Sequence, residues 1–293
     1  MELYYARIAA LVAITLIYML FDVFNRRNVP NAFVYATLAI GFGFTLLYLN
    51  LPAIIFSVAV SLTVLGFGYA AYRMGQLGGA DVAELAAISL ILPLQPRPIL
   101  MPFLAQLGFP FIVSMLVNTG IVAIILVPLY YLPKASRKVG KPLMSFVTKA
   151  SAFKAILMAV AYLAFIAFVT AFVNVGYAGI ALLLALLFCS TAIVLFSTPI
   201  TYSMIEYVDA SKLEEGDIIA FNLMDRRSIS ALERKVEGFD RLVSIKLLKK
   251  LKSSKIREKL PVYKEAMPFA LPIFIALLAS LLLGNLLLFV LAA

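Results

Sequence analysis

The sequence predicts an all-α polytopic membrane protein with about eight transmembrane helices and a small mixed α/β cytoplasmic block inserted before the last helix. The first reason is composition: of 293 residues, 63% are hydrophobic and only 14% are charged. A chain this apolar lacks the polar residues that cover a soluble globular protein. The second reason is that apolar runs near the roughly 20 residues needed to cross a bilayer as a helix recur along the chain.

The apolar runs give the predicted spans, and the basic residues between them give the orientation. The spans are residues 4–24, 32–49, 52–72, 82–95, 109–132, 154–174, 177–199 and 267–291. Arg26 and Arg27 follow the first span, and Arg73 follows the third. Six more basic residues join the fifth and sixth spans: Lys134, Arg137, Lys138, Lys141, Lys149 and Lys154. Because short cytoplasmic loops collect Lys and Arg, we expect a cell-membrane protein with these loops in the cytoplasm and both termini outside.

The one long polar stretch covers residues 201–265. It holds 14 Lys and Arg against 11 Asp and Glu, a balance of 14 − 11 = +3, so it is mixed rather than a basic tail. We expect it to fold against the cytoplasmic face. The chain then divides into a membrane domain (1–200), a cytoplasmic domain (201–265) and a C-terminal transmembrane helix (266–293).

Three patterns occur inside the cytoplasmic domain. A turn at Glu215-Gly216-Asp217 is expected to lead into a short strand. Ser230 to Glu233 has the form of a capping box, with apolar residues at helical spacing around and behind it. These residues are Leu232, Val236, Phe239 and Val243. The lysine-rich stretch 246–259 fits either an interfacial helix on anionic lipid headgroups or an amphipathic helix packed on the rest of the domain.

Residue types that are absent or rare exclude several chemistries. The chain has no histidine, which excludes Ser-His and Cys-His nucleophile pairs and His-ligated zinc. The single cysteine, Cys189, lies in an apolar run and cannot form an intramolecular disulfide. Hydrolytic chemistry would therefore use carboxylates, hydroxyls, lysines or backbone groups. No metal site and no cofactor are expected.

Carboxylates at membrane depth are few, which makes each of them a candidate functional group. Of the 15 Asp and Glu, 11 lie in the cytoplasmic domain, and Glu2 belongs to the N-terminus. The other three are Asp22, Asp81 and Glu84. Asp22 lies about one turn before the cytoplasmic end of the first span and Asp81 opens the fourth, so topology places both at the same depth.

Two aspartates at matched depth predict a catalytic dyad. If their helices are neighbours, the two groups cannot easily ionise together, and the pair shares one proton. Aspartic proteases use this state. The ionised partner takes a proton from the attacking water, while the protonated partner donates one to the scissile carbonyl oxygen.

Residues around Asp81 supply candidate substrate contacts. Gly78 and Gly79 lack Cβ atoms, so the backbone there is free to bend and a substrate main chain can approach. A glycine-rich loop with Asp81 as a helix cap explains the same residues without a substrate. Glu84 follows Asp81 by three residues on the same helix face and is a candidate receptor for a basic substrate side chain. A polar contact to a neighbouring helix is the alternative for Glu84.

"DVFNRRNVPN" (residues 22–31) followed by "GGAD" (78–81) resembles the type IV prepilin peptidases, most closely the archaeal preflagellin and prepilin peptidases. The resemblance covers the first four spans. It implies a GxGD-type intramembrane aspartyl protease in which Asp22 and Asp81 are catalytic. The implied partners are prepilin-like or preflagellin-like precursors, whose short basic leaders are cut on the cytoplasmic side, and membrane lipid; nucleic acid is not among them.

The sequence departs from the bacterial members of this family in two ways. Ala80 stands where they have the second glycine of the motif. A cytoplasmic segment with paired cysteines is also missing, so peptidase activity without methyltransferase activity is expected. "PFALP" (268–272) is similar to the PAL motif of presenilins, although a proline-marked helix start gives the same pattern.

A proton- or sodium-coupled transporter is the alternative function, because transporters also use paired membrane aspartates. Transporter sites usually lie near the bilayer midplane, often between inverted repeats. Here the aspartates lie near one surface and no repeat is evident, which favours the protease. A membrane scaffold that docks partners through the cytoplasmic domain would leave both aspartates without a role.

Overall fold

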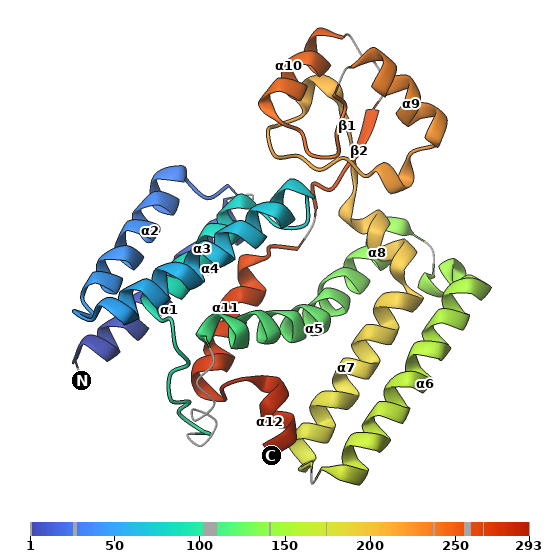
Figure 1. The fold of residues 1–293 in the computed structure, drawn as a ribbon. Helices are drawn as coiled ribbons and strands as arrows, with labels where there is room; N and C mark the ends of the chain where they lie inside the picture. The colour runs from blue at the N-terminus through green and yellow to red at the C-terminus, as the bar shows by residue number, and fades with distance from the viewer. Residues whose placement is uncertain are drawn as a thin grey trace.

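The computed structural model describes residues 2–25, 28–101, 110–140, 142–173, 175–236, 238–254, 259–265 and 267–292. These residues are mostly helical, with one two-stranded sheet. Figure 1 shows a large assembly of helices and, beside it, a small body that contains the sheet. We call this small body, residues 206–264, the inserted domain.

Five helices in the described part of the chain are long and apolar enough to cross a membrane. They are α1 (Glu2–Phe24), α3 (Leu51–Arg73), α5 (Phe111–Val139), α6 (Lys149–Phe172) and α7 (Tyr177–Leu195). Three other predicted spans form shorter helices: α2 (Asn31–Leu46), α4 (Gly79–Ile91) and α11 (Ala270–Leu282). The chain is therefore a multi-pass membrane protein, but the predicted count of eight spans is not confirmed.

Two predicted spans are each divided into two helices. The span 177–199 ends with α7, and a separate short helix, α8 (Ser197–Met204), leads to the inserted domain. The span 267–291 breaks at Gly284, where φ is +81°, and continues as α12 (Leu286–Ala292). Asn118 of α5 holds this break, since its amide donates to the Gly284 carbonyl (2.8 Å) and accepts from the Leu286 N–H (2.8 Å). The backbone groups that lose their helical partners at the break are thus hydrogen-bonded by the Asn118 side chain.

Helix α4 lies inside the helical assembly rather than at its surface. Every residue from Val82 to Ile91 is buried, and α4 packs between α2 and α3. Hydroxyl groups of the flanking helices donate to its carbonyls, as in Ser61 to Ala86 (3.1 Å) and Thr45 to Leu90 (2.9 Å). Small polar side chains of this kind allow close helix packing in an apolar environment. A helix covered on all sides can be shorter than a lipid-exposed span.

The inserted domain has a small sheet and its own hydrophobic core. Strand β1 (Glu206–Asp209) pairs antiparallel with β2 (Lys259–Val262), and two helices, α9 (Arg226–Lys235) and α10 (Ile245–Ser253), cover them. Short 3-10 turns lie at Ala210–Lys212 (η3) and Phe221–Leu223 (η4), and a third, η2 (Leu143–Phe146), precedes α6. The core contains Val208, Leu213, Ile219, Leu232, Val236, Phe239, Val243, Leu247, Leu251, Leu260 and Val262.

The three sequence patterns in this domain correspond only in part to the structure. The turn at residues 215–217 is present, with Gly216 at φ +88°, but only isolated bridges follow it instead of a strand. The capping box at Ser230 is wrong, because α9 begins four residues earlier, at Arg226. For the lysine-rich stretch, Leu247 and Leu251 pack into the domain core. This supports the packed amphipathic helix over the lipid-facing one.

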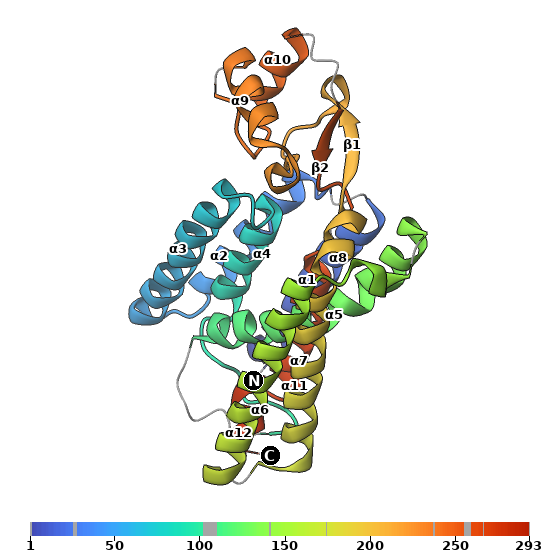
Figure 2. The same ribbon diagram turned by 90° about the vertical axis from the view of Figure 1, so that its right-hand side faces the viewer.

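The two chain termini lie toward the end of the molecule that faces away from the inserted domain (Figures 1 and 2). The basic helix ends lie on the opposite side, because Lys134 and Lys138 contact Glu265 next to that domain. This arrangement has the charge asymmetry that predicts cytoplasmic basic loops. Arg26, Arg27 and Lys141, which contributed to that prediction, lie outside the described residues. The side of the membrane on which each end lies stays a prediction.

Candidate active site

Asp22 lies in the last turns of α1 and is almost fully buried, with 8% of its surface exposed. Its Oδ2 accepts a hydrogen bond from the backbone N–H of Ala270 (2.9 Å), the first residue of α11. The first N–H groups of a helix have no partner within the helix and form its positive end. Asp22 therefore caps a helix that is 248 residues away in the sequence.

Asp81 lies in the first turn of α4 and is partly exposed. Its Oδ2 accepts from the backbone N–H of Gly78, at 3.1 Å. A Cβ atom at Gly78 would lie only 2.8 Å from this oxygen, whereas one at Gly79 would make ordinary contact with the Tyr72 ring at 3.7 Å. Gly78 has φ −75°, which any residue adopts, so its lack of a side chain matters for space and not for backbone freedom.

Glu84 lies one turn beyond Asp81 and has no exposed surface. Neither of its carboxylate oxygens has a hydrogen-bond partner within the part of the chain that the structure describes. The group interacts electrostatically with both Asp81 and Asp22. Glu84 is thus within electrostatic range of both aspartates, where α1 contacts α4, and we call the carboxyl groups of Asp22, Asp81 and Glu84 the carboxyl cluster.

Tyr18, one turn before Asp22, joins α1 to α2 beside the carboxyl cluster. Its hydroxyl pairs with the Thr37 hydroxyl of α2 at 2.9 Å, and its ring packs on Phe33 with centroids 5.0 Å apart.

Sequence reasoning missed the hydrogen bond from the Ala270 backbone N–H to Asp22. The PFALP segment was interpreted as a helix start, and α11 does begin at its central Ala270. No side-chain pattern marks a backbone donor, and its distance from Asp22 along the chain hides the pairing. The only available signal was the similarity of PFALP to the presenilin motif.

The carboxyl cluster can hold a shared proton. Carboxyl groups that lie close together in a mostly buried place are not easily charged at the same time, so such neighbours can share a proton. In the described residues, no set of three or more His, Cys, Asp or Glu is arranged to hold a metal ion. The chemistry available to the cluster itself is proton transfer to and from water or a bound amide.

Comparison with known families gives this geometry a context. The model of the type IV leader peptidase family matches residues 9–129, which include the whole carboxyl cluster. Residues 9–129 are therefore similar to the type IV leader peptidases, as the sequence motifs predicted. This similarity points to peptidase activity and prepilin-type substrates.

A second family model, described as TQO small subunit DoxD, matches residues 103–270. The chain is similar to this membrane family from the region of α5 to the start of α11. That match contains none of the three carboxyl groups, so the leader peptidase match is the one that bears on the cluster. No curated protein and no solved structure matches the chain.

Proposed function

We propose that the protein is an intramembrane aspartyl endopeptidase that removes short basic leaders from prepilin-like or preflagellin-like precursors on the cytoplasmic side. The observation that supports it is that Glu84 interacts electrostatically with both Asp81 and Asp22, which come from different helices. The leader peptidase match covers these same residues.

In this proposal Asp22 and Asp81 share one proton and act on one water molecule. The ionised aspartate takes a proton from the water, and the water oxygen attacks the scissile carbonyl carbon. The protonated aspartate gives its proton to the carbonyl oxygen, forming a tetrahedral intermediate. The C–N bond then breaks as the leaving nitrogen takes a proton from one aspartate. The other aspartate takes a proton from a hydroxyl of the intermediate while its C=O bond re-forms, so the dyad again holds one proton.

The start of α4 is the proposed place for the extended substrate. Gly78 and Gly79 are exposed, next to Asp81, and present backbone without side chains. A helical substrate segment must unwind here, because helical amides keep their carbonyls in internal hydrogen bonds. Glu84 is the proposed receptor for a leader Lys or Arg. Since it has no exposed surface here, that contact requires the helices packed around Glu84 to open toward the substrate.

The decisive experiment uses the purified protein in lipid vesicles with a tagged precursor that carries a basic leader. Wild type is expected to cleave it without added metal, and Asp22→Asn and Asp81→Asn are each expected to give essentially no product. Asp225→Asn, an exposed aspartate of the inserted domain, is the matched control and should cleave normally. Proton or sodium flux that depends on Asp22 and Asp81, without cleavage of any such precursor, would instead support the transporter.

A further inference from the structure

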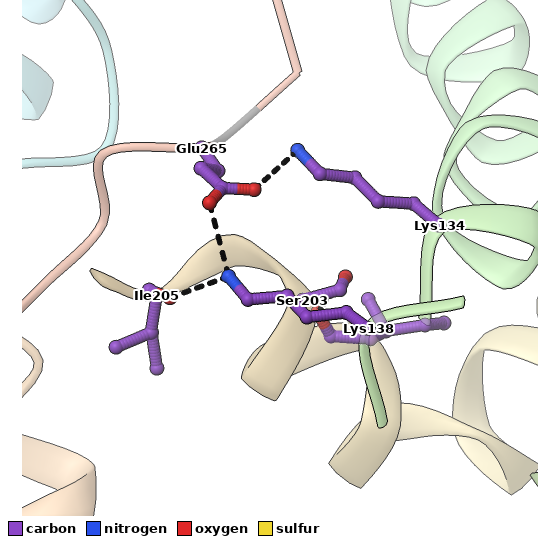
Figure 3. Close-up of polar contacts among 6 residues, drawn as sticks. Lys134, Lys138, Ser203, Ile205 and Glu265 are labelled. Carbon is purple, nitrogen blue, oxygen red and sulfur yellow. Dashed lines mark hydrogen bonds and ion pairs between the residues drawn. The ribbon is translucent and has the colours of Figure 1, made fainter. Parts of the chain in front are cut away.

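The inserted domain is fastened to α5 where its chain leaves and re-enters the helical assembly. Lys134 Nζ pairs with Glu265 Oε2 at 2.7 Å, and Lys138 Nζ pairs with Glu265 Oε1 at 3.0 Å (Figure 3). Lys138 Nζ also donates to the Ile205 carbonyl at 2.8 Å. The Glu265 N–H donates to the Met204 carbonyl at 3.0 Å. One cluster of contacts, which we call the clamp, thus holds both connections of the domain.

The clamp is ionic under ordinary conditions. Burial raises the pKa of Glu265, but the paired Lys134 and Lys138 outweigh it and hold that pKa below its usual value. Each of the three side chains is about one-third exposed, at 31%, 37% and 33%. Water screens ion pairs that are this exposed, so the clamp contributes little to the free energy of folding. Its main effect is to fix the relative positions of the residues that it joins.

The clamp lies a short distance along the chain from the Asp22 contact. Ala270, whose N–H binds Asp22, follows Glu265 by five residues. Pro268 restricts the backbone of this connection, since its ring fixes φ. Phe269 packs against the hydrophobic core of the helical assembly. Displacement of Glu265 would therefore reach the first turn of α11 and its donor to Asp22.

A second contact joins the inserted domain to the Asp81 side. Ile218 lies against Gly75 in the loop between α3 and α4, where a Cβ atom would be 3.5 Å from Ile218 Cγ2. Gly75 is buried, has φ +66° and precedes Asp81 by six residues. The loop that leads to Asp81 is therefore covered by a residue of the inserted domain.

The two contacts are joined by a short path within the inserted domain. Next to Ile218, Asp217 pairs with Lys264 (Oδ1 to Nζ, 2.9 Å), and the Ile218 carbonyl accepts from the Tyr263 N–H at 3.0 Å. Lys264 is directly followed by Glu265 of the clamp. One hydrogen bond and one ion pair thus connect the segment of Ile218, which lies against Gly75, to the segment that ends at Glu265 of the clamp.

We propose that the inserted domain is a brace that holds Asp22 and Asp81 in their relative positions, with Glu265 acting on the Asp22 side and Ile218 on the Asp81 side. This inference deepens the proposed function and rests on it. The residues named are positioning residues, because none of them touches the reacting atoms. The inserted domain (residues 206–264) holds 14 Lys and Arg against 10 Asp and Glu, a balance of 14 − 10 = +4. A positive domain is poorly suited to bind a basic leader, so a role as a brace explains it better.

The test compares Glu265→Gln and Ile218→Ala with wild type in lipid vesicles. Each variant is expected to lower kcat about threefold to tenfold with little change in KM, because the loss is in positioning the dyad and not in binding the leader. Glu214→Gln is the matched control. It removes another ion pair of the same domain, Glu214 with Lys264 (3.2 Å), and leaves Glu265 and Ile218 in place, so kcat should stay at the wild-type value.

A distance measurement separates the brace from the proposed function. Spin labels at Phe24→Cys and Met74→Cys, both exposed positions, report on the ends of α1 and α3 near the two aspartates, with Cys189→Ala as background. The distance distribution is expected to be narrow in the wild-type background, broader with Glu265→Gln or Ile218→Ala, and unchanged with Glu214→Gln. Unchanged distances in the first two variants would overturn the brace, whatever their kcat. If no precursor is cleaved, the proposed function fails, and the distances still decide on the brace.

Discussion

Replacing Gly78 by Ala tests the geometry of Asp81 without disturbing the fold. The Gly78 backbone, at φ −75° and ψ 148°, suits alanine as well as glycine, so no strain arises in the main chain. The added Cβ would lie 2.8 Å from Asp81 Oδ2. Real Cβ contacts are not this short, so the carboxylate must turn away and give up its hydrogen bond from the Gly78 N–H.

The expected loss follows from that one hydrogen bond. A hydrogen bond to a charged group contributes about 1.5–3 kcal/mol. If the rotated carboxylate loses this amount in the transition state, kcat falls about 10- to 100-fold. Stability should change little, because the end of a flexible side chain gives way and not the core.

Gly79→Ala is the matched control, one residue along. Its Cβ would touch the Tyr72 ring at 3.7 Å, an ordinary distance, and alanine favours a helix start more than glycine does. This variant leaves the Asp81 carboxylate in place, so it should lose much less kcat than Gly78→Ala and unfold at the same or a higher temperature. Cleavage rates in lipid vesicles and thermal unfolding in detergent check both variants. Wild-type kcat in Gly78→Ala, or an equal loss in Gly79→Ala, would refute the assigned position of the Asp81 carboxylate.

Three further variants test other parts of the structure. Glu84→Gln should weaken cleavage of basic leaders more than of neutral ones, and equal loss for both in a kcat/KM comparison would remove its proposed role as receptor. Asn118→Leu leaves polar groups at Gly284 and Leu286 without partners, so unfolding in detergent should show a loss of about 2 kcal/mol or more. Because the folded pKa of Glu265 is lowered, the stability from its clamp is present above the ordinary value of 4.5 and is lost as pH falls through the folded value. The unfolding temperatures of wild type and Glu265→Gln should therefore differ at pH 7 and converge as the pH falls below the lowered pKa of Glu265.

The sequence selected the candidate site residues by a different signal from the one that gave the spans. Asp22 and Asp81 stood out because carboxylates are rare in the apolar part of this chain. This rarity does not depend on where the helix boundaries are placed. The spans rested on apolar length, which does not tell a lipid-exposed helix from a buried one. Helix α4 is apolar because α2 and α3 cover it, so its 13 residues resembled a spanning helix without having its length.

Contacts between distant residues were beyond sequence reasoning. The Ala270 donor, the Asn118 side chain in the break before α12 and the Gly75 contact with Ile218 each join segments far apart in the chain. None of them changes the local pattern of hydrophobicity or charge. The error at Ser230 has another origin, because the capping-box pattern also occurs inside a helix that starts earlier.

Hydrogen-bond donors distinguish the members of the carboxyl cluster from one another. Where water is scarce, a carboxylate needs N–H donors to carry charge. Asp22 has the Ala270 N–H at a helix start, and Asp81 has the Gly78 N–H at the start of another helix. Among the described residues Glu84 has neither, although it lies beside both. Only Asp22 and Asp81 are thus equipped for the alternation between charged and neutral forms that water activation demands. This favours Asp22 and Asp81 as the dyad. For Glu84 it favours a role in which the carboxyl group ionises only when a cationic partner binds.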